Sequence, residues 1–175
     1  MQDSLLFLVK TLTDLYILTF LLRFVLQWIR ADFYNPFSQF ILRATNPLVA
    51  PVRRVVPSVG GVDTATLLVL VVLQSIANWM LLAITGRSLP PLLFAREVVL
   101  SLVYLTLWMY SIAILVYVVL SWIGQSYGNP IAHILGQLVE PVLRPFRRII
   151  PPIGGLDIAP LLALIIIQAL MIAVR

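Results

Sequence analysis

The chain has 175 residues, of which 61% are hydrophobic and 11% are charged, and its mean hydropathy of +1.04 excludes a soluble domain of average composition. Its net charge is +5, but the arginines lie beside apolar stretches instead of forming a basic surface, so direct nucleic-acid binding is not expected. The absence of cysteine excludes disulfides, thiolate nucleophiles and sulfur-ligated metals.

The first predicted element is a membrane-spanning helix over about residues 5–29, which exceeds the roughly 20 residues that cross a bilayer. Lys10, Asp14 and Arg23 lie within it, and ionisable residues inside a membrane are functional candidates because their burial is costly. Lys10 and Asp14 are four residues apart, so they share a helix face and can pair. The competing interpretation is structural: Lys10 neutralises Asp14, while Lys10 and Arg23 extend towards opposite interfaces.

An interfacial amphipathic helix is predicted over about residues 37–56. Apolar residues recur there at helical spacing, namely at Phe37, Phe40, Ile41, Ala44 and Leu48. A short helix with one such stripe lies in the interface plane or packs on a bundle, and it does not span. Pro51 is expected in the first turn of a short helix that carries Arg53 and Arg54. Anionic lipid headgroups, or the acidic segment of a partner, are the candidate ligands of this arginine pair.

The chain is then predicted to reverse at Gly60-Gly61, and Asp63 is predicted to cap the helix that follows. That helix is the second span, over about residues 65–84, and it carries Gln74 with Asn78 one turn further on. Amides in hydrocarbon need hydrogen-bond partners, so these two either hold helices together or line a hydrated passage.

The second half of the chain repeats the first at a constant offset of ninety-four residues. The offset carries Trp28 to Trp122, Asn35-Pro36 to Asn129-Pro130, Arg53-Arg54 to Arg147-Arg148, Asp63 to Asp157 and Gln74 to Gln168. One unit has therefore been duplicated. The second copy is predicted to hold a span over about residues 98–123, an interfacial helix over about 131–150 and a short span over about 158–174.

The two copies differ in their polar residues. Lys10, Asp14 and Arg23 become Tyr104, Trp108 and Tyr117, which argues against an ion path shared by both halves. The glutamines are kept, and two arrangements stay open for them. Gln74 and Gln168 could pair across an axis between the repeats, or each could bond within its own repeat.

The predicted fold is therefore an all-α membrane protein of four transmembrane helices in two tandem repeats, residues 1–86 and 87–175. Seven arginines lie in the two loops that carry the arginine pairs, against four basic residues on the other side. The positive-inside rule makes these loops and the interfacial helices cytoplasmic and both termini periplasmic. Two spans per unit give both copies one orientation, which defines parallel repeats.

The doubled pattern Pro-x-x-x-Pro-x-Arg-Arg-x-x-Pro-x-x-Gly-Gly-x-Asp, together with the segment Asp32–Gln39, resembles the YggT family of bacterial and plastid membrane proteins. The resemblance implies a multi-pass inner-membrane protein connected with osmotic or potassium stress, with division-site and nucleoid organisation or, in plastids, with cytochrome assembly. It carries over no catalytic residue and no cofactor. Asp32 and Tyr34 become Ser126 and Gly128 in the second copy, so the two repeats would not contact a partner equivalently.

No catalytic, cofactor or metal site is predicted. His133 is the only histidine, and the chain has no glycine-rich phosphate loop, metal-ligand cluster or paired carboxylates. The leading hypothesis is a non-enzymatic factor that supports envelope or osmotic homeostasis, or the assembly of membrane complexes, by binding partners. Its expected partners are anionic lipids, other membrane, division or envelope proteins, and further copies of itself in a homo-oligomer. The alternatives are a subunit of a channel or transporter for potassium or protons, and a division-site or nucleoid factor.

Overall fold

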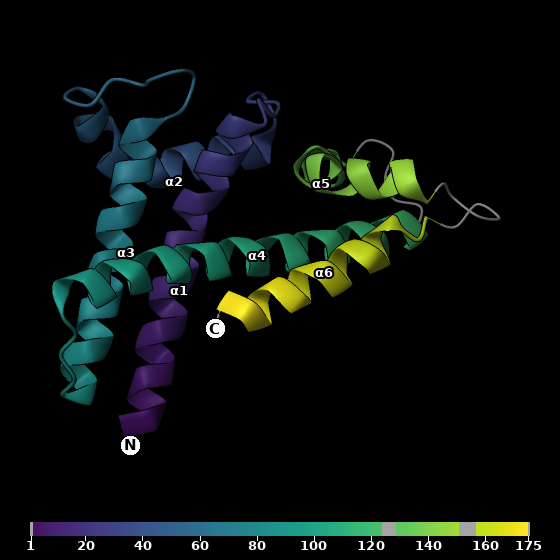
Figure 1. The fold of residues 1–175 in the computed structure, drawn as a ribbon. Helices are drawn as coiled ribbons and strands as arrows, with labels where there is room; N and C mark the ends of the chain where they lie inside the picture. Colours follow the sequence, from purple (N-terminus) through teal and green to yellow (C-terminus); the bar gives the residue numbers. More distant parts are fainter. Residues whose placement is uncertain (1, 124–128, 151–156, 175) are drawn as a thin grey trace.

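The computed structural model describes residues 2–123, 129–150 and 157–174. Within these ranges the chain is helical and forms no named strand, which confirms the predicted all-α class. Figure 1 shows the six helices in chain order: α1 (Gln2–Trp28), α2 (Pro36–Arg53), α3 (Thr64–Thr85), α4 (Pro91–Ile123), α5 (Pro130–Ile149) and α6 (Ala159–Val174).

Three of the helices are long and apolar enough to cross a membrane, and they cover Asp3–Trp28, Thr64–Thr85 and Pro91–Ile123. The predicted fourth span corresponds to α6, which has 16 residues. At 1.5 Å per residue such a helix is about 24 Å long, which is less than the roughly 30 Å of a hydrocarbon core. Helix α4 has 33 residues and begins at Pro91, earlier than predicted. Its first turns carry Arg96 and Glu97, which the apolar run used for the prediction left out.

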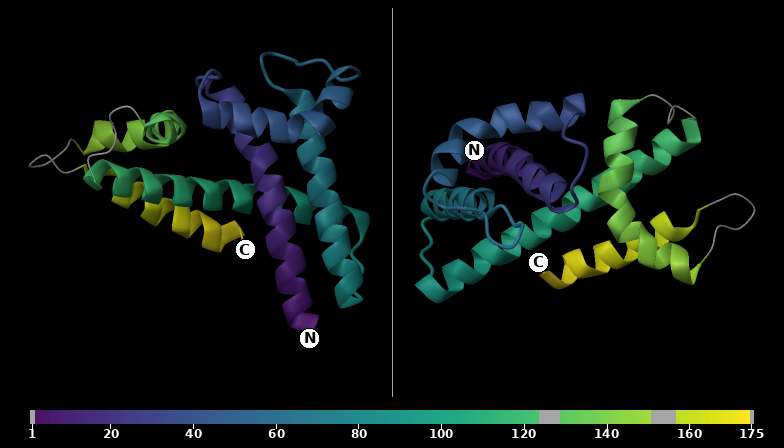
Figure 2. Two further views of the ribbon diagram at one scale, coloured as in Figure 1. Left: turned by 180° about the vertical axis from the view of Figure 1, so that it is seen from behind. Right: turned by 90° about the horizontal axis from the view of Figure 1, so that it is seen from above.

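Equivalent helices make equivalent contacts in the two halves of the chain. Helix α1 packs on α3, and α4 packs on α6; α2 covers α1 and α3, and α5 covers α4 and α6. The halves meet where α4 touches α3 and α1 and where α5 touches α2. The α4–α6 pair crosses the α1–α3 pair and does not run alongside it (Figures 1 and 2).

One hydrophobic core joins the two halves. Phe20 of α1, Leu70 of α3, Ile114 of α4 and Leu143 of α5 belong to it, and each is at most 1% exposed. The outer faces of the long helices are also apolar, with Phe7, for example, 68% exposed. A helix that is apolar on all sides suits a lipid environment, where the outer surface needs no polar groups.

Helices α2 and α5 begin in the same way. The side chains of Asn35 and Asn129 accept hydrogen bonds of 2.9 Å from the backbone N–H groups of Phe37 and Ile131. A proline follows each asparagine at the first helical position, where its missing N–H leaves no hydrogen bond unmade. Each Asn-Pro pair therefore starts the helix that follows it.

The prediction that Pro51 and Pro145 begin short helices was wrong. Both lie inside continuous helices, four residues after Pro47 and Pro141. An internal proline removes one helical hydrogen bond and bends the axis, but it does not end a helix that is held by packing on both sides of the bend. Both helices are bent along their length (Figure 2).

Of the apolar stripe predicted for α2, only Ile41 is fully buried. The buried residues are Ser38, Ile41, Thr45 and Val49, whereas Phe40 is 64% exposed. In α5 the predicted stripe packs better, because Ile134 and Leu138 are buried while Ile131 is exposed. Helix α2 therefore buries partly polar positions against α1 and α3 and keeps an apolar edge outside.

Candidate functional site

Arg53, the first residue of the first arginine pair, is held by the cap of the next helix. Asp63 precedes α3, is 2% exposed, and accepts hydrogen bonds from the backbone N–H and the hydroxyl of Thr66 at 3.2 and 2.5 Å. The predicted cap is thus present, and its carboxylate also forms an ion pair with Arg53 at the end of α2. Burial by itself would raise the pKa of Asp63, but the hydrogen bonds from Thr66 and Arg53 outweigh it and lower the pKa.

The reversal between these two residues occurs at the predicted glycines. Val59 and Val62 exchange backbone hydrogen bonds of 3.2 and 3.0 Å across Gly60 and Gly61. Both glycines have positive φ angles, +60° and +83°, which residues with a side chain rarely adopt. The turn returns the chain from α2 to α3 and brings Asp63 to Arg53.

The second copy repeats the arrangement with more partners. The Nε and Nη2 atoms of Arg147 each lie 2.8 Å from Asp157, and Nη1 lies 2.5 Å from Glu140. Asp157 also accepts a hydrogen bond of 3.0 Å from the backbone N–H of Ala159, the first residue of α6. It lies one residue before the capping position, which Ile158 occupies. Burial alone would lower the pKa of Arg147, but its hydrogen bonds with Tyr117 and Asp157 raise it. The predicted reversal at Gly154-Gly155 lies outside the described residues.

The two arginines of each pair therefore differ. Arg53 and Arg147 are bound to aspartates within the chain, and we call each of these ion pairs an arginine clamp. Arg54 and Arg148 are exposed and form no ion pair with any described residue. The sequence prediction treated all four as equivalent. The recurring ten-residue spacing from arginine to aspartate could have indicated the clamps.

In the first span, the predicted ion pair between Lys10 and Asp14 is present at 2.9 Å. Arg23 does not extend freely to an interface. It is 3% exposed, and its Nη1 donates hydrogen bonds to the side chains of Thr45 and Asn46 at 2.7 and 2.8 Å. Arg23 thus joins α1 to α2.

Gln74 and Gln168, which occupy equivalent positions in the two repeats, do not contact each other. Gln74 is buried and donates a hydrogen bond of 2.9 Å to Asn78, which in turn lies 3.4 Å from the hydroxyl of Ser101 on α4. Gln168 is exposed on α6, and its side chain has no hydrogen bond to a described residue. The arrangement within one repeat is therefore the observed one for Gln74. Ile172 stands where the offset would place a partner like Asn78.

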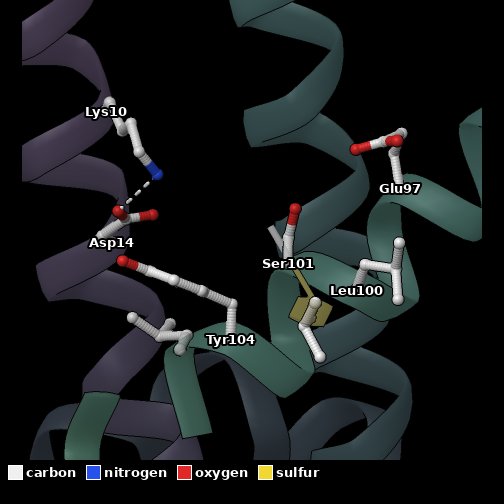
Figure 3. A pocket seen from close by; sticks show the side chains of 8 residues that line it. Lys10, Asp14, Glu97, Leu100, Ser101 and Tyr104 are labelled. Atoms are coloured by element: carbon white, nitrogen blue, oxygen red, sulfur yellow. Dashed lines mark hydrogen bonds and ion pairs between the residues drawn. The ribbon is translucent and has the colours of Figure 1, made fainter. Parts of the chain in front are cut away.

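A polar cavity lies between α1 and α4, as Figure 3 shows. Lys10 and Asp14 face Glu97, Ser101 and Tyr104 across a cavity of about 270 Å³. A neighbouring groove of about 480 Å³ shares Lys10, Glu97 and Ser101, and it adds Asn78, Thr85 and Arg87.

Glu97 and Ser101 were not predicted as site residues. Their place in the cavity results from the packing of α4 on α1 and α3, which no local spacing encodes. In the next turns of α1, Ile17 and Phe20 are apolar and at most 1% exposed. Among the described residues no three His, Cys, Asp or Glu side chains form a group that could hold a metal ion.

A family model described as CCB3/YggT matches residues 2–84 and again residues 97–175. The chain belongs to this family. It is 36% identical over 173 residues to the protein named YggT of Escherichia coli K12, covering 99% of the chain and 90% of that protein. It is 44% identical over 170 residues to a Vibrio alginolyticus protein described by its position in the proC 3' region, covering 95% of the chain and 91% of that protein.

A plastid relative matches over a shorter range. The chloroplastic YlmG homolog protein 2 of Arabidopsis thaliana is 40% identical over 60 residues, which cover 34% of the chain and 24% of that protein. No solved structure matches the chain significantly. The family and its similar members indicate no enzyme class.

Proposed function

We propose that this member of the CCB3/YggT family is a non-enzymatic, multi-pass protein of the bacterial inner membrane, which supports envelope or osmotic homeostasis by holding partners at the cytoplasmic surface. In this proposal α1, α3, α4 and α6 all cross the membrane as two tandem parallel repeats, which requires the α4–α6 pair to turn from the crossed arrangement of Figure 1 into line with α1 and α3. The short α6 is accommodated by tilt or local thinning. The separate family matches to each half and the equivalent helix contacts support the repeats. The arginine distribution supports periplasmic termini.

The observation that carries the proposal is the pair of clamps. Each clamp fixes the end of α2 or α5 with its first arginine and leaves the next arginine, Arg54 or Arg148, exposed. Helices α2 and α5 touch each other and lie on the same side of the molecule (Figure 1). Two unpaired cations are thus held on one surface, where anionic headgroups or an acidic partner segment can bind them.

Exposed apolar side chains support an interfacial position for this surface. Phe40 of α2 is 64% exposed, and Val55, next to Arg54, is 82% exposed. Trp28 and Trp122, at equivalent ends of α1 and α4, are 62% and 76% exposed. Aromatic rings at the ends of spans favour the headgroup region, and apolar residues beside arginines can enter the acyl boundary.

The test replaces Arg54 and Arg148 by glutamine together and leaves both clamps intact. The matched control replaces Arg30 and Arg43, two other exposed arginines of the first half that form no ion pair with a described residue, so both variants lose two charges. Each protein is purified in mild detergent, and its bound phosphatidylglycerol and co-purifying proteins are identified by mass spectrometry. Each surface charge contributes about 1 kcal/mol to binding anionic lipid. We therefore expect the test variant to lose bound lipid, a partner or both.

The two ligand classes give different results. Less bound phosphatidylglycerol in the test variant, with a difference from the wild type that shrinks as added salt weakens wild-type binding, indicates a headgroup site, since salt screens exposed charges over roughly 10 Å. Loss of one co-purifying protein with unchanged lipid indicates a docking site. Wild-type behaviour of the test variant, or equal losses in the control, would contradict the proposal.

The cavity between α1 and α4 favours a second candidate, a subunit for potassium or proton transport, because Lys10, Asp14 and Glu97 line it. A transporter reconstituted in liposomes would carry ions, and replacing Asp14, Gln74 and Gln168 would abolish the flux. Our proposal expects no flux above that of protein-free liposomes.

A division-site or nucleoid role would be tested by imaging the tagged protein, which would then concentrate at mid-cell.

A further inference from the structure

The groove beside Glu97 lies at the end of the molecule opposite α2. It is formed by the last turns of α3, the loop that follows them and the first turns of α4, close to the first half of α1 (Figure 1). Its volume is about 480 Å³, and its polar lining residues are Lys10, Asn78, Thr85, Arg87, Glu97 and Ser101. In the proposed topology this end reaches the outer headgroup layer.

Two exposed side chains of opposite charge line the groove, and neither has a partner among the described residues. Lys10 is neutralised by Asp14 at 2.9 Å. Arg87 and Glu97 form no ion pair and no side-chain hydrogen bond with any described residue, although both line the same groove. A bare cation would match only Glu97, and a bare anion would match only Arg87. The ligand that satisfies both carries a negative and a positive group close together.

The remaining wall of the groove is apolar. Leu81, Leu82, Leu89 and Phe94 line it, and a neighbouring depression of about 430 Å³ continues this wall past Trp79. The groove therefore joins a charged end to an apolar surface at the lipid boundary. A small water-soluble zwitterion would leave this surface uncovered, whereas acyl chains would bury it.

We propose that the groove is a binding site for one aminophospholipid, a lipid whose headgroup carries a phosphate and a primary ammonium. Arg87 binds the phosphate. Glu97 accepts hydrogen bonds from the ammonium, and Ser101 supplies a hydroxyl beside it. The acyl chains lie along Leu82 and Phe94. This site is independent of the cytoplasmic arginines of the proposed function.

The experiment compares phosphatidylethanolamine, phosphatidylcholine and phosphatidylglycerol with identical acyl chains, bound to the purified full-length protein in detergent and counted by native mass spectrometry. The wild type should bind phosphatidylethanolamine best, because the choline headgroup has no N–H to donate and the glycerol headgroup has no cation. Hydrogen bonds to charged groups correspond to roughly a tenfold change in affinity or more. Glu97→Gln should therefore weaken the binding of phosphatidylethanolamine about tenfold and leave the binding of phosphatidylglycerol unchanged. Arg87→Gln should weaken the binding of all three lipids.

Three controls decide the outcome. Arg96 is exposed next to Glu97 but does not line the groove. The variant Arg96→Gln should therefore bind the lipids like the wild type. Glu97→Asp keeps the charge and should retain the preference, which separates loss of binding from loss of folding. Potassium chloride and choline chloride at equal ionic strength should displace the lipid equally. Displacement by potassium alone, or an unchanged preference in Glu97→Gln, would overturn the proposal.

Discussion

The hydroxyl oxygen of Tyr117 lies 3.4 Å from Nη2 of Arg147, and Tyr117 stands in the second half of the chain where Arg23 stands in the first. In the first half the guanidinium is on the long helix: Arg23 of α1 donates to the hydroxyl of Thr45 on α2. In the second half it is on the bent helix, since Arg147 of α5 donates to Tyr117 of α4. The same position joins the same two elements in both halves, although the charge has changed sides.

The hydrogen bond between Arg23 and Thr45 predicts that substitutions at its two ends change the free energy of unfolding by different amounts. Thr45→Val preserves the shape but leaves the buried guanidinium with fewer acceptors, so it should reduce the free energy of unfolding by about 1–3 kcal/mol. Arg23→Met should cost less, because Thr45 keeps its 2.7 Å bond to the carbonyl oxygen of Ile41 and Asn46 is exposed to solvent. Replacing a buried charged side chain by an apolar one of similar size often changes the free energy of unfolding little.

The measurement is reversible unfolding in mixed detergent micelles, followed by circular dichroism for both variants and the wild type. Tyr117→Phe is the matched change in the second half. It removes one long hydrogen bond and should cost less than about 1 kcal/mol. A larger loss for Arg23→Met than for Thr45→Val would show that Arg23 stabilises the fold through its charge.

The helices could be predicted from the sequence because their signals are local. Long apolar runs, the Asn-Pro starts of α2 and α5 and the glycine reversal before Asp63 each act within a few residues. The duplication strengthened these predictions, since each feature occurs twice. The ion pair of Lys10 with Asp14 was also predictable, because both residues lie on one helix face.

The cavity could not be predicted in the same way, because it depends on how helices pack. Glu97 precedes the apolar run of α4, and only the crossing of α4 over α1 and α3 brings it towards Lys10. The apolar stripe of α2 was visible, but its buried face shares only Ile41 with that stripe and otherwise consists of Ser38, Thr45 and Val49. Helical periodicity indicates a face, but it does not indicate which neighbour covers it.

Asp63 should make stability depend on pH. Its pKa in the folded protein is lowered below the ordinary value of 3.8 by hydrogen bonds from Thr66 and Arg53, despite burial. The resulting stabilisation is fully present above the unfolded pKa and is lost as the pH falls through the folded pKa. Asp63→Asn keeps a capping side chain but cannot ionise, so it should be less stable than the wild type at neutral pH, with the difference closing at acidic pH.

The measurement is the unfolding midpoint of both proteins between about pH 2 and pH 7, at constant ionic strength. Arg53→Gln provides the companion variant: without the guanidinium the carboxylate is less favoured, and the acid transition should move to higher pH. A constant difference between wild type and Asp63→Asn over the whole range would show that the charge of Asp63 does not contribute.

The proposed topology predicts a labelling pattern. The chain has no cysteine, so single cysteines can be introduced without a background. Cysteines at Ser58 and Pro152, in the two cytoplasmic loops, should be shielded from a membrane-impermeant thiol reagent added to intact spheroplasts. A cysteine at Ser88, between α3 and α4, should react, and permeabilised cells provide the control in which all three react. The reverse pattern would invert the orientation.

Substitutions at the two equivalent glutamines, Gln74 and Gln168, should affect the stability of the fold differently. Gln74 is buried and bonded to Asn78, and its own Oε1 atom is buried without a partner among the described residues. Gln74→Leu removes that bond and leaves Asn78 less satisfied, so we expect a loss of about 0.6–2 kcal/mol of unfolding free energy. Gln168→Leu changes an exposed side chain of α6 that bonds to no described residue, and it should leave the stability of the monomer unchanged or raise it. Unfolding titrations in detergent compare the two variants, and size-exclusion chromatography with light scattering shows whether the oligomeric state changes. A larger loss for Gln168→Leu, with a smaller oligomer, would place Gln168 in an interface between copies of the chain.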